Sequence, residues 1–380
     1  MRSLRLAAAC AALIAHPAGA QSVFDSEVRL APQYMQYRLD APSNETISQL
    51  AIPLFVSIPI SPRLTVDVGT SYARSLVTGA NGRSELSGLT DTQVRGNLTL
   101  GTDYIVLTLG LNLPTGKSGV TLDEYAAASR IGNDFLAFPI ANMGTGFAGT
   151  GGIAVARPLG EWNLGLGAAV RRATSYEPFN IPNQSMRFQP GNEYRMRVGA
   201  DRIVGVGRLA LGLTVSKFGE DDAGGSRFRS GSRLIAQTVY TSSIGGKDLV
   251  VGAYDVFRSS GQFASGGSSG RENVANLFGT LGLRANDRVI EPTVELRHWR
   301  QEVPVFNAGT NSAERIAQNS FLGSLGVRTR LELGGVTVFP GVGFTVGRLA
   351  VTTSSAVAEN VGLTGFRAQI AMRAAPFAGQ

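Results

Sequence analysis

The chain alternates its side chains with a period of two over most of its length, from about residue 28 to residue 373. In the run 105–113 every odd-numbered residue is Ile or Leu, whereas Thr108, Gly110 and Asn112 lie between them. A period of two places alternate side chains on opposite faces of a β-strand. Nearly every such run has an apolar face, and no amphipathic helices remain to cover these faces. Strands of this kind fit a barrel with lipid outside and water inside.

The N-terminus has the pattern of an export signal. Arg2 and Arg5 precede an apolar stretch over residues 6–15, and Ala18-Gly19-Ala20 has the small residues of a cleavage site. We therefore predict a signal peptide over residues 1–20, cleaved after Ala20, and an outer-membrane barrel domain over residues 21–380. Cleavage would remove Cys10, the one cysteine, so a disulfide-stapled fold is excluded.

Composition excludes several other classes of protein. No segment approaches the roughly 20 consecutive apolar residues that a membrane-spanning helix needs. The 48 glycines and 17% charged residues argue against a long helical protein and against disorder. The net charge of +7 falls to +5 without Arg2 and Arg5. Because the arginines are spread over many strands and form no basic run, nucleic-acid binding is disfavoured and a modestly cationic lumen or surface is favoured.

The connections between the runs alternate between short and long. Gly, Pro, Asn and Asp mark tight turns at 61–62, 102–103, 158–161, 204–207, 245–246, 285–287 and 334–335. Longer polar stretches lie near 39–44, 76–88, 115–147, 177–190, 219–230, 260–271, 300–318 and 350–358. Seven turns and eight loops predict an all-β, transmembrane, antiparallel up-and-down β-barrel of about 16 strands, with 14 or 12 as alternatives and both termini on one side.

Several strands agree on which residues face inward. Charged residues alternate with apolar ones, and a dry soluble core would not tolerate so many charges, whereas a wet lumen would. A two-layer soluble sandwich explains one strand equally well, but so many long strands rarely close a single core. The predicted pore-lining residues are Asp91, Arg95, Glu193, Arg195, Arg197, Glu291, Glu295, Arg297, Arg328, Arg330, Glu332 and Arg367.

The longest connection, residues 115–147, has structure of its own. Thr121 and Glu124 form the pattern of a capping box, which predicts a short helix with a break at Gly132-Asn133. Two interpretations stay open: an extracellular excursion over the rim, or a loop folded into the pore. In the second case its apolar residues would form a constriction: Leu122, Tyr125, Phe135 and Phe138.

Short motifs around this loop carry a family resemblance. Gly88-Leu-Thr-Asp91 begins a strand, Leu113-Pro-Thr-Gly116 ends the next one, and Gly144-Thr-Gly146 follows. In this order the motifs, within residues 88–170, resemble the MetA-pathway phenol-degradation family of outer-membrane proteins. The resemblance implies a channel for small hydrophobic or aromatic compounds, without naming a substrate.

The sequence offers no credible catalytic or metal site. His298 is the only histidine after residue 20, and its alternation places it with the apolar face, so a Ser-His-Asp site is disfavoured. Gly266–Gly270 and Gly144–Gly149 match G-x-S-x-G and G-x-G-x-x-G, but neither has the strand–turn–helix setting that those motifs need. A zinc site is disfavoured because the chain after residue 20 has no cysteine and no second histidine to bind the ion. We therefore predict a non-enzyme without metal or cofactor.

Two functional classes remain. The first is a porin-like channel for passive or selective uptake of small solutes, and the second is a plugged structural or adhesion barrel that binds through its extracellular loops. A barrel of about 16 strands favours the channel because it leaves an aqueous lumen. The expected partners are the outer-membrane bilayer and a small solute. The sequence indicates neither the solute nor the oligomeric state.

Overall fold

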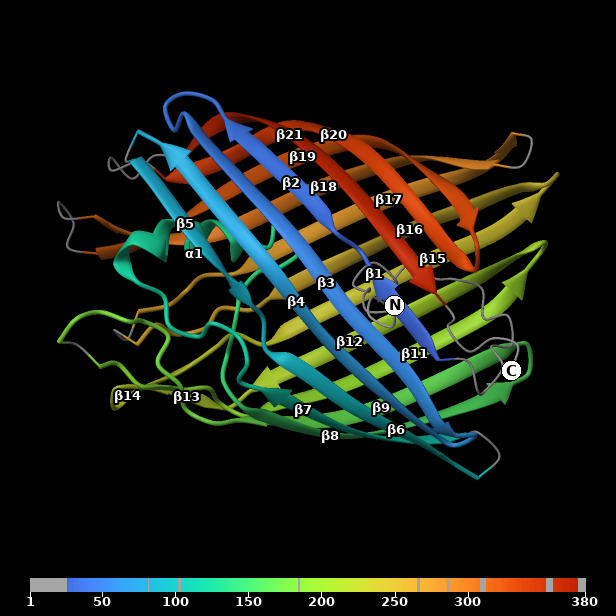
Figure 1. The fold of residues 1–380 in the computed structure, drawn as a ribbon. Helices are drawn as coiled ribbons and strands as arrows, with labels where there is room; N and C mark the ends of the chain where they lie inside the picture. Colours follow the sequence, from blue (N-terminus) through green and yellow to red (C-terminus); the bar gives the residue numbers. More distant parts are fainter. Residues whose placement is uncertain are drawn as a thin grey trace, which may run out of the picture.

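A computed structural model describes residues 26–374, except 81, 102–103, 184, 265–266, 286–287, 308–311 and 353–357. The predicted signal peptide at 1–20 lies outside the described residues. The described chain forms a closed antiparallel barrel of 16 strands that are tilted against the barrel axis (Figure 1), which confirms the predicted fold. No helix in the described part is long and apolar enough to cross a membrane.

Consecutive strands of the barrel pair with each other, and the first pairs with the last. β1 and β2 are halves of a single wall strand, because both pair with β21 and β3. β5 and β6 likewise form one wall strand, because both pair with β4. The wall contains β1 (Glu27–Leu30), β2 (Gln33–Leu39), β3 (Glu45–Ser61), β4 (Leu64–Gly79), β5 (Gly82–Leu89), β6 (Thr92–Leu100), β7 (Ile105–Leu113), β8 (Ala148–Leu159), β9 (Trp162–Ala173), β11 (Glu193–Val204), β12 (Gly207–Phe218), β15 (Arg233–Ile244), β16 (Lys247–Arg258), β17 (Glu272–Ala285), β18 (Arg288–Asn307), β19 (Ser312–Leu333), β20 (Val336–Thr352) and β21 (Ala358–Ala374).

Tight turns lie at one end of the barrel and long loops at the other, as predicted. Gly245-Gly246 and Gly334-Gly335 make two of the turns with positive φ, a conformation that glycine adopts without steric cost. β1 starts and β21 ends at the turn side, where Val28 pairs with Ala374. At the loop side a small separate sheet contains β10 (Phe188–Gln189), β13 (Glu220–Ala223) and β14 (Ser226–Arg229).

Two of the predicted loops are mostly wall strand. β4 and β5 pair from Tyr72–Leu89 to Gly79–Gly82, across the stretch 76–88 that we expected to be a loop. β18 and β19 likewise cover most of 300–318. Their polar side chains lie on wall strands that continue past the apolar band, where water replaces lipid on the outer face. Polar composition there marks the end of the apolar band and not the end of the strand.

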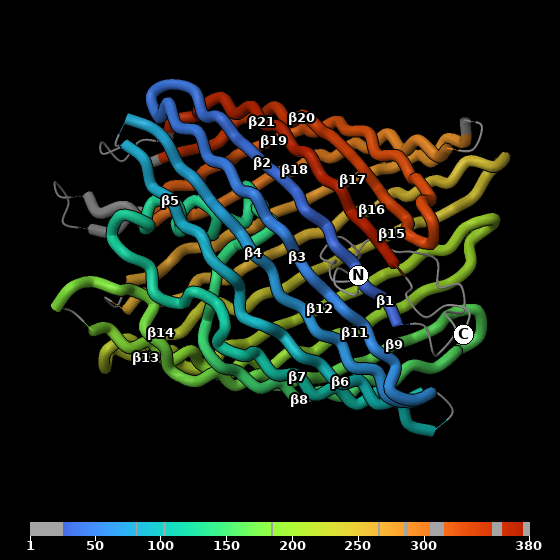
Figure 2. Tube along the Cα trace, in the orientation of Figure 1, coloured from blue at the N-terminus to red at the C-terminus, as the bar shows by residue number. Residues whose placement is uncertain are grey.

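The long loop between β7 and β8, residues 114–147, lies inside the barrel. It bonds to Gln49 and Glu45 on β3 and also to Arg297 on β18 and Arg258 on β16. Only a segment in the lumen can contact strands on such separate parts of the wall at once (Figures 1 and 2). This answers the question that the sequence left open about the loop, and it also identifies the inner face of every strand.

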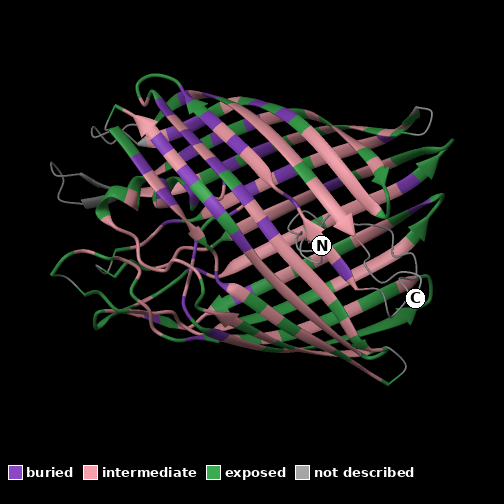
Figure 3. Ribbon diagram, in the orientation of Figure 1, coloured by how far each residue is buried: buried purple, intermediate pink, exposed green. Residues whose placement is uncertain are grey.

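The outer face is apolar and exposed, and the closest packing occurs where the loop meets the wall. Leu109, Leu325 and Phe344 are 73%, 69% and 65% exposed on the outer face. A buried cluster joins the loop to inward positions of several strands, and Figure 3 shows its buried positions alternating with less buried ones along β2–β5. The inner face is therefore partly apolar where the loop covers it.

Candidate functional site

A short helix starts the inward path of the loop. The 3₁₀ turn η1 (Leu122–Glu124) leads into α1 (Tyr125–Ile131), which ends at Gly132 as predicted. Glu124 Oε2 accepts a hydrogen bond from the backbone N–H of Thr121 at 3.1 Å, and Glu124 also forms a salt bridge with Lys117. Partial burial opposes ionisation of Glu124, but the bonds from Lys117 and Thr121 outweigh it, so its pKa lies below the ordinary value.

Two aromatic rings of the loop are packed against the wall. Phe135 stacks on Trp299 of β18 with ring centroids 5.6 Å apart, and Phe138 meets Tyr37 of β2 edge-on at 5.5 Å. Phe135 is fully buried and Phe138 is 5% exposed. Aromatic burial of this kind contributes a large part of the packing energy of an interior. The loop is therefore held against one side of the lumen.

Gln49 on β3 binds the loop as a neighbouring strand would. Its Oε1 accepts from the N–H of Ile140 at 2.9 Å, and its Nε2 donates to the carbonyl of Ile140 at 2.8 Å. Nε2 also donates to Ser75 Oγ at 2.9 Å. The side chain is fully buried, so every one of these bonds matters, because an unpaired buried amide is costly.

Charged pairs fix the loop at three further points. Arg130 of α1 makes two bonds of 2.8 Å to the carboxylate of Glu45, which raise the pKa of Arg130 above its ordinary value. Asp134 accepts a bond of 3.0 Å from Arg258. Arg297 Nη1 donates to the carbonyl of Phe135 at 2.5 Å while Nη2 pairs with Glu295. These contacts come from β3, β16 and β18.

Asp91 fastens the two ends of the loop together. Its Oδ1 accepts from the N–H of Gly116 at 3.0 Å, and its Oδ2 accepts from the N–H of Thr145 at 2.7 Å and from Asn112 Nδ2 at 2.9 Å. The backbone N–H of Asp91 donates to the carbonyl of Met143 at 3.1 Å. We call Asp91 with Asn112, Gly116 and Thr145 the loop anchor.

The three sequence motifs meet at the loop anchor. A Cβ on Gly116 would lie 2.2 Å from the carbonyl oxygen of Met143 and 2.5 Å from the backbone nitrogen of Asp91, so only glycine fits. A Cβ on Gly144 would lie 3.1 Å from Asp91 Oδ1. The motifs that carry the resemblance thus hold the neck of the loop, and none of their contacts described here points to a bound solute.

The other predicted pore-lining residues lie on the inner face of the wall, in two groups. Arg95, Glu193, Arg195 and Arg197 lie on β6 and β11, and strand pairing keeps them in phase with one another. The second group occupies β18, β19 and β21, and is made up of Glu291, Glu295, Arg297, Arg328, Arg330, Glu332 and Arg367. A contact between these residues and a solute is a proposal.

Four of the predicted site residues are buried in the structure. Asp91 and Arg297 are each 7% exposed, because the loop covers them and hydrogen-bonds to both side chains. Phe135 and Phe138 are buried against the wall and do not face an open bore. Leu122 and Tyr125 are 68% and 56% exposed, so they are the members of the predicted constriction that a solute can reach. Sequence patterns could not show which inward residues the loop would cover.

The wall from β6 to β12 is the side that the loop leaves free. Arg95, Arg195 and Arg197 are exposed there, and Arg95 and Arg197 form no salt bridge in the part of the chain described. On one side their inward neighbours are small, in the pairs Arg95–Gly110, Arg195–Ala169 and Arg197–Gly167. On the other side they pair with Asp67, Ser216 and Thr214 in the same order. We call this inner face of β6–β12 the arginine wall. Its inward charges are Arg95, Arg171, Arg195, Arg197, Arg208, Glu193 and Asp201.

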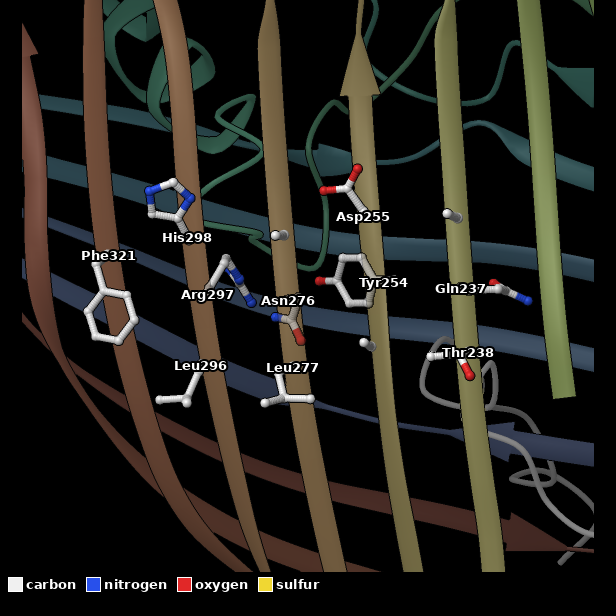
Figure 4. Close-up of a pocket in the computed structure, with 13 residues that line it drawn as sticks. Gln237, Thr238, Tyr254, Asp255, Asn276, Leu277, Leu296, Arg297, His298 and Phe321 are labelled. Atoms are coloured by element: carbon white, nitrogen blue, oxygen red, sulfur yellow. The ribbon is translucent and has the colours of Figure 1, made fainter. Parts of the chain in front are cut away.

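The outer face has a hollow of about 490 Å³ across β15–β19 (Figure 4). Small side chains, among them Ala236, Ala253 and Ala275, form part of its lining beside Leu296 and His298. His298 pairs with Ala275 and Phe321 on this face, away from the lumen. Among the described residues no three His, Cys, Asp or Glu side chains are grouped so that they could hold a metal ion.

Comparisons with known proteins show likeness in fold at low identity. No protein-family model matches the chain, and no curated protein matches its sequence significantly. An outer membrane channel from Pseudomonas putida F1 is 12% identical, with 97% of this chain and 99% of that chain covered and a TM-score of 0.38. Pseudomonas putida OprB is 10% identical, with 91% and 94% covered and a TM-score of 0.48. The CymD monoaromatic hydrocarbon channel is 10% identical, with 93% and 88% covered and a TM-score of 0.42. These values carry no inference beyond the barrel fold, so the resemblance to the phenol-degradation family stays a prediction.

Proposed function

We propose that this protein is an outer-membrane channel through which small solutes pass by diffusion along the arginine wall. The observation that carries the proposal is the one-sided position of the 114–147 loop. The buried cluster that it forms with the wall involves β2–β5 and β16–β21 and leaves out the small residues of β6–β12. A barrel of 16 strands is wide enough to hold both this loop and a water-filled path.

The outer membrane is the proposed location because the barrel is apolar outside and charged inside. Exposed residues such as Leu109, Leu325 and Phe344 would cost free energy in water and gain it in lipid. The signal peptide predicted at 1–20 would deliver the chain to that membrane. The expected environment is therefore a lipid bilayer around the wall and water in the lumen.

The charge of the bore favours anions. The arginine wall carries five arginines and two carboxylates at inward positions, and a narrow lumen of low-dielectric walls concentrates ions of the opposite sign. At the loop, Leu122 and Tyr125 offer apolar contact, and the ring of Tyr125 lies 6.2 Å from that of Phe179. We therefore propose small solutes that combine an acidic group with an apolar or aromatic body, in line with the family resemblance.

The charge preference can be measured directly in a planar bilayer under a salt gradient. The native protein should show a reversal potential that indicates preference for chloride over potassium. Replacing Arg95, Arg195 and Arg197 together by glutamine should shift this potential toward zero or past it, because the bore loses its excess positive charge. The matched control replaces Arg157, Arg172 and Arg202, which lie on the outer face of β8, β9 and β11. An equal shift in the control would refute a bore along the arginine wall.

A further inference from the structure

The lumen contains a second recess, away from the loop anchor and from the arginine wall. A cavity of about 340 Å³ lies against the inner face of β2 and β16–β21. Tyr254, Glu295 and Arg328 line it, and so do six further side chains, of which Arg367 has the more exposed guanidinium group: Gln33, Phe278, Thr280, Ser324, Arg367 and Gln369. We call these six residues the niche.

Glycines in the wall make room for the niche. Gly343 pairs with Arg367 across β20 and β21, and a Cβ at Gly343 would be in ordinary van der Waals contact with Arg367 Nη2, at 3.8 Å. The ring of Phe278 lies over Gly252 of β16, where a Cβ would come within 2.4 Å of the ring. Glycine in a strand interior often marks such a close approach. Phe278 pairs with Glu295 across β17 and β18, and Glu295 Oε2 lies 4.0 Å from Arg367, so the ring and the guanidinium line the same recess.

The charges around the niche do not balance. Arg328 pairs with Glu291, and Arg297 pairs with Glu295, so both carboxylates already have a close arginine. Glu295 Oε1 also accepts a bond of 2.6 Å from Asn276 Nδ2. Arg367 is left with a contact of 4.0 Å to Glu295 Oε2, and its side chain is 36% exposed to the cavity. One positive charge in the recess therefore lacks a close counter-charge.

From this imbalance we infer that the niche binds the carboxylate of a small organic monoanion during its passage. Arg367 supplies a planar pair of N–H donors, which match a carboxylate in two parallel hydrogen bonds. Gln33, Thr280 and Gln369 line the recess and can donate further bonds, and Phe278 offers an apolar face to the body of the solute. A dianion or a cation would leave the charge unbalanced again. This inference rests on the proposed channel and names the chemical class that it would pass.

Binding should be weak, as a transit site in a channel requires. A dissociation constant on the order of 1 mM corresponds to a residence that still permits rapid release. The niche would then raise the local concentration of the anion without blocking the path along the arginine wall. Selection would come from the guanidinium pairing, because a neutral solute of the same shape gains only the contact with Phe278.

The test uses the detergent-solubilised full barrel and two probes of equal shape, propionate and propionamide. Saturation-transfer NMR titrations should show propionate bound by the native protein with a dissociation constant on the order of 1 mM. Arg367→Gln should weaken propionate binding about tenfold or more, because it removes the paired N–H donors and the charge. Arg367→Lys should restore part of the binding, and propionamide should be insensitive to both changes.

A matched control and a separate current measurement keep the two proposals apart. Arg202→Gln removes one arginine from the outer face, where Arg202 lies over the ring of Trp162, and it should leave propionate binding unchanged. Equal binding of propionate and propionamide, or unchanged propionate binding by Arg367→Gln, would refute the niche as a carboxylate site. This conclusion does not depend on the measured conductance. If the native protein binds propionate but passes no ion current, the proposed channel is refuted and the niche remains as a binding site.

Discussion

Replacing residues 119–142 by a short Gly-Ser linker is expected to raise the single-channel conductance about twofold or more, because the lumen of a 16-stranded barrel is then no longer shared with a packed loop. The replacement removes α1 and the rings of Phe135 and Phe138, and it retains the loop anchor at both ends of the linker. The barrel wall should still close, since no residue of the replaced segment belongs to a wall strand. Planar-bilayer recordings of the refolded protein give the conductance, and retained heat-modifiability in electrophoresis shows that the barrel has folded.

The control for this variant shortens a different loop. Replacing residues 220–229 removes β13 and β14, which lie at the loop side outside the barrel wall. Its conductance should stay close to that of the native protein. A conductance that is unchanged in both variants would mean that the 114–147 loop does not limit the bore.

Asp91→Ala is expected to release the loop without unfolding the barrel. The carboxylate accepts three bonds, from Gly116, Thr145 and Asn112, and bonds to a buried charge contribute about 1.5–3 kcal/mol each. Even a net loss of about 3 kcal/mol would shift the ratio of anchored to released loop by more than about 100-fold. Recordings should therefore change from one steady level to several, with a mean current approaching that of the loop-replaced protein.

Asp67→Ala is the matched control for this second variant. Asp67 also lies on the inner face, but it bonds only to the wall, through Ser57 Oγ at 2.8 Å and Asn97 Nδ2 at 3.0 Å. The change removes the same charge from the lumen and should leave a single conductance level. Steady current from Asp91→Ala, or multiple levels from both variants, would refute the role of the loop anchor. Gln49 and Arg297 would then be enough to hold the loop.

The wall of the barrel could be predicted from sequence because each strand carries its own evidence. The run 105–113 repeats Ile or Leu at every second position, and Arg195 and Arg197 alternate with Met196 and Val198. A strand that divides lipid from water has to follow such a period, whatever its neighbours are. Tight turns at glycine pairs made it possible to count the strands. These local signals fixed both the fold class and the inner face.

The contacts of the loop could not be predicted, because they join residues far apart in the chain. Gln49 and Ile140 are 91 positions apart, and Arg297 and Phe135 are 162 apart. One signal was present in the sequence: inward positions such as Ile47, Leu322 and Leu363 are apolar, which a water-filled lumen does not favour. Strands that are apolar on both faces indicate that something inside the barrel covers them.

Asp91 shows why a residue type in the correct phase is not enough to assign a role. It stands next to a strand whose charged residues face inward, so it was grouped with Arg95 among the pore-lining residues. In the structure its carboxylate accepts hydrogen bonds from both ends of the loop, at Gly116 and Thr145, and from Asn112 of β7. A carboxylate flanked by Gly116 and Gly144 can be surrounded by backbone, and this close approach is what the glycines permit.

The central claim is that an open bore runs along the arginine wall, and a cysteine at position 195 tests it most directly. The mature chain would contain no other cysteine, since Cys10 lies in the predicted signal peptide. Single-channel current through Arg195→Cys is recorded before and after addition of an anionic, water-soluble methanethiosulfonate. We expect a stable current that falls in one irreversible step when the reagent attaches. A protein that passes no current, or a current that the reagent leaves unchanged while mass spectrometry shows complete labelling, would contradict it.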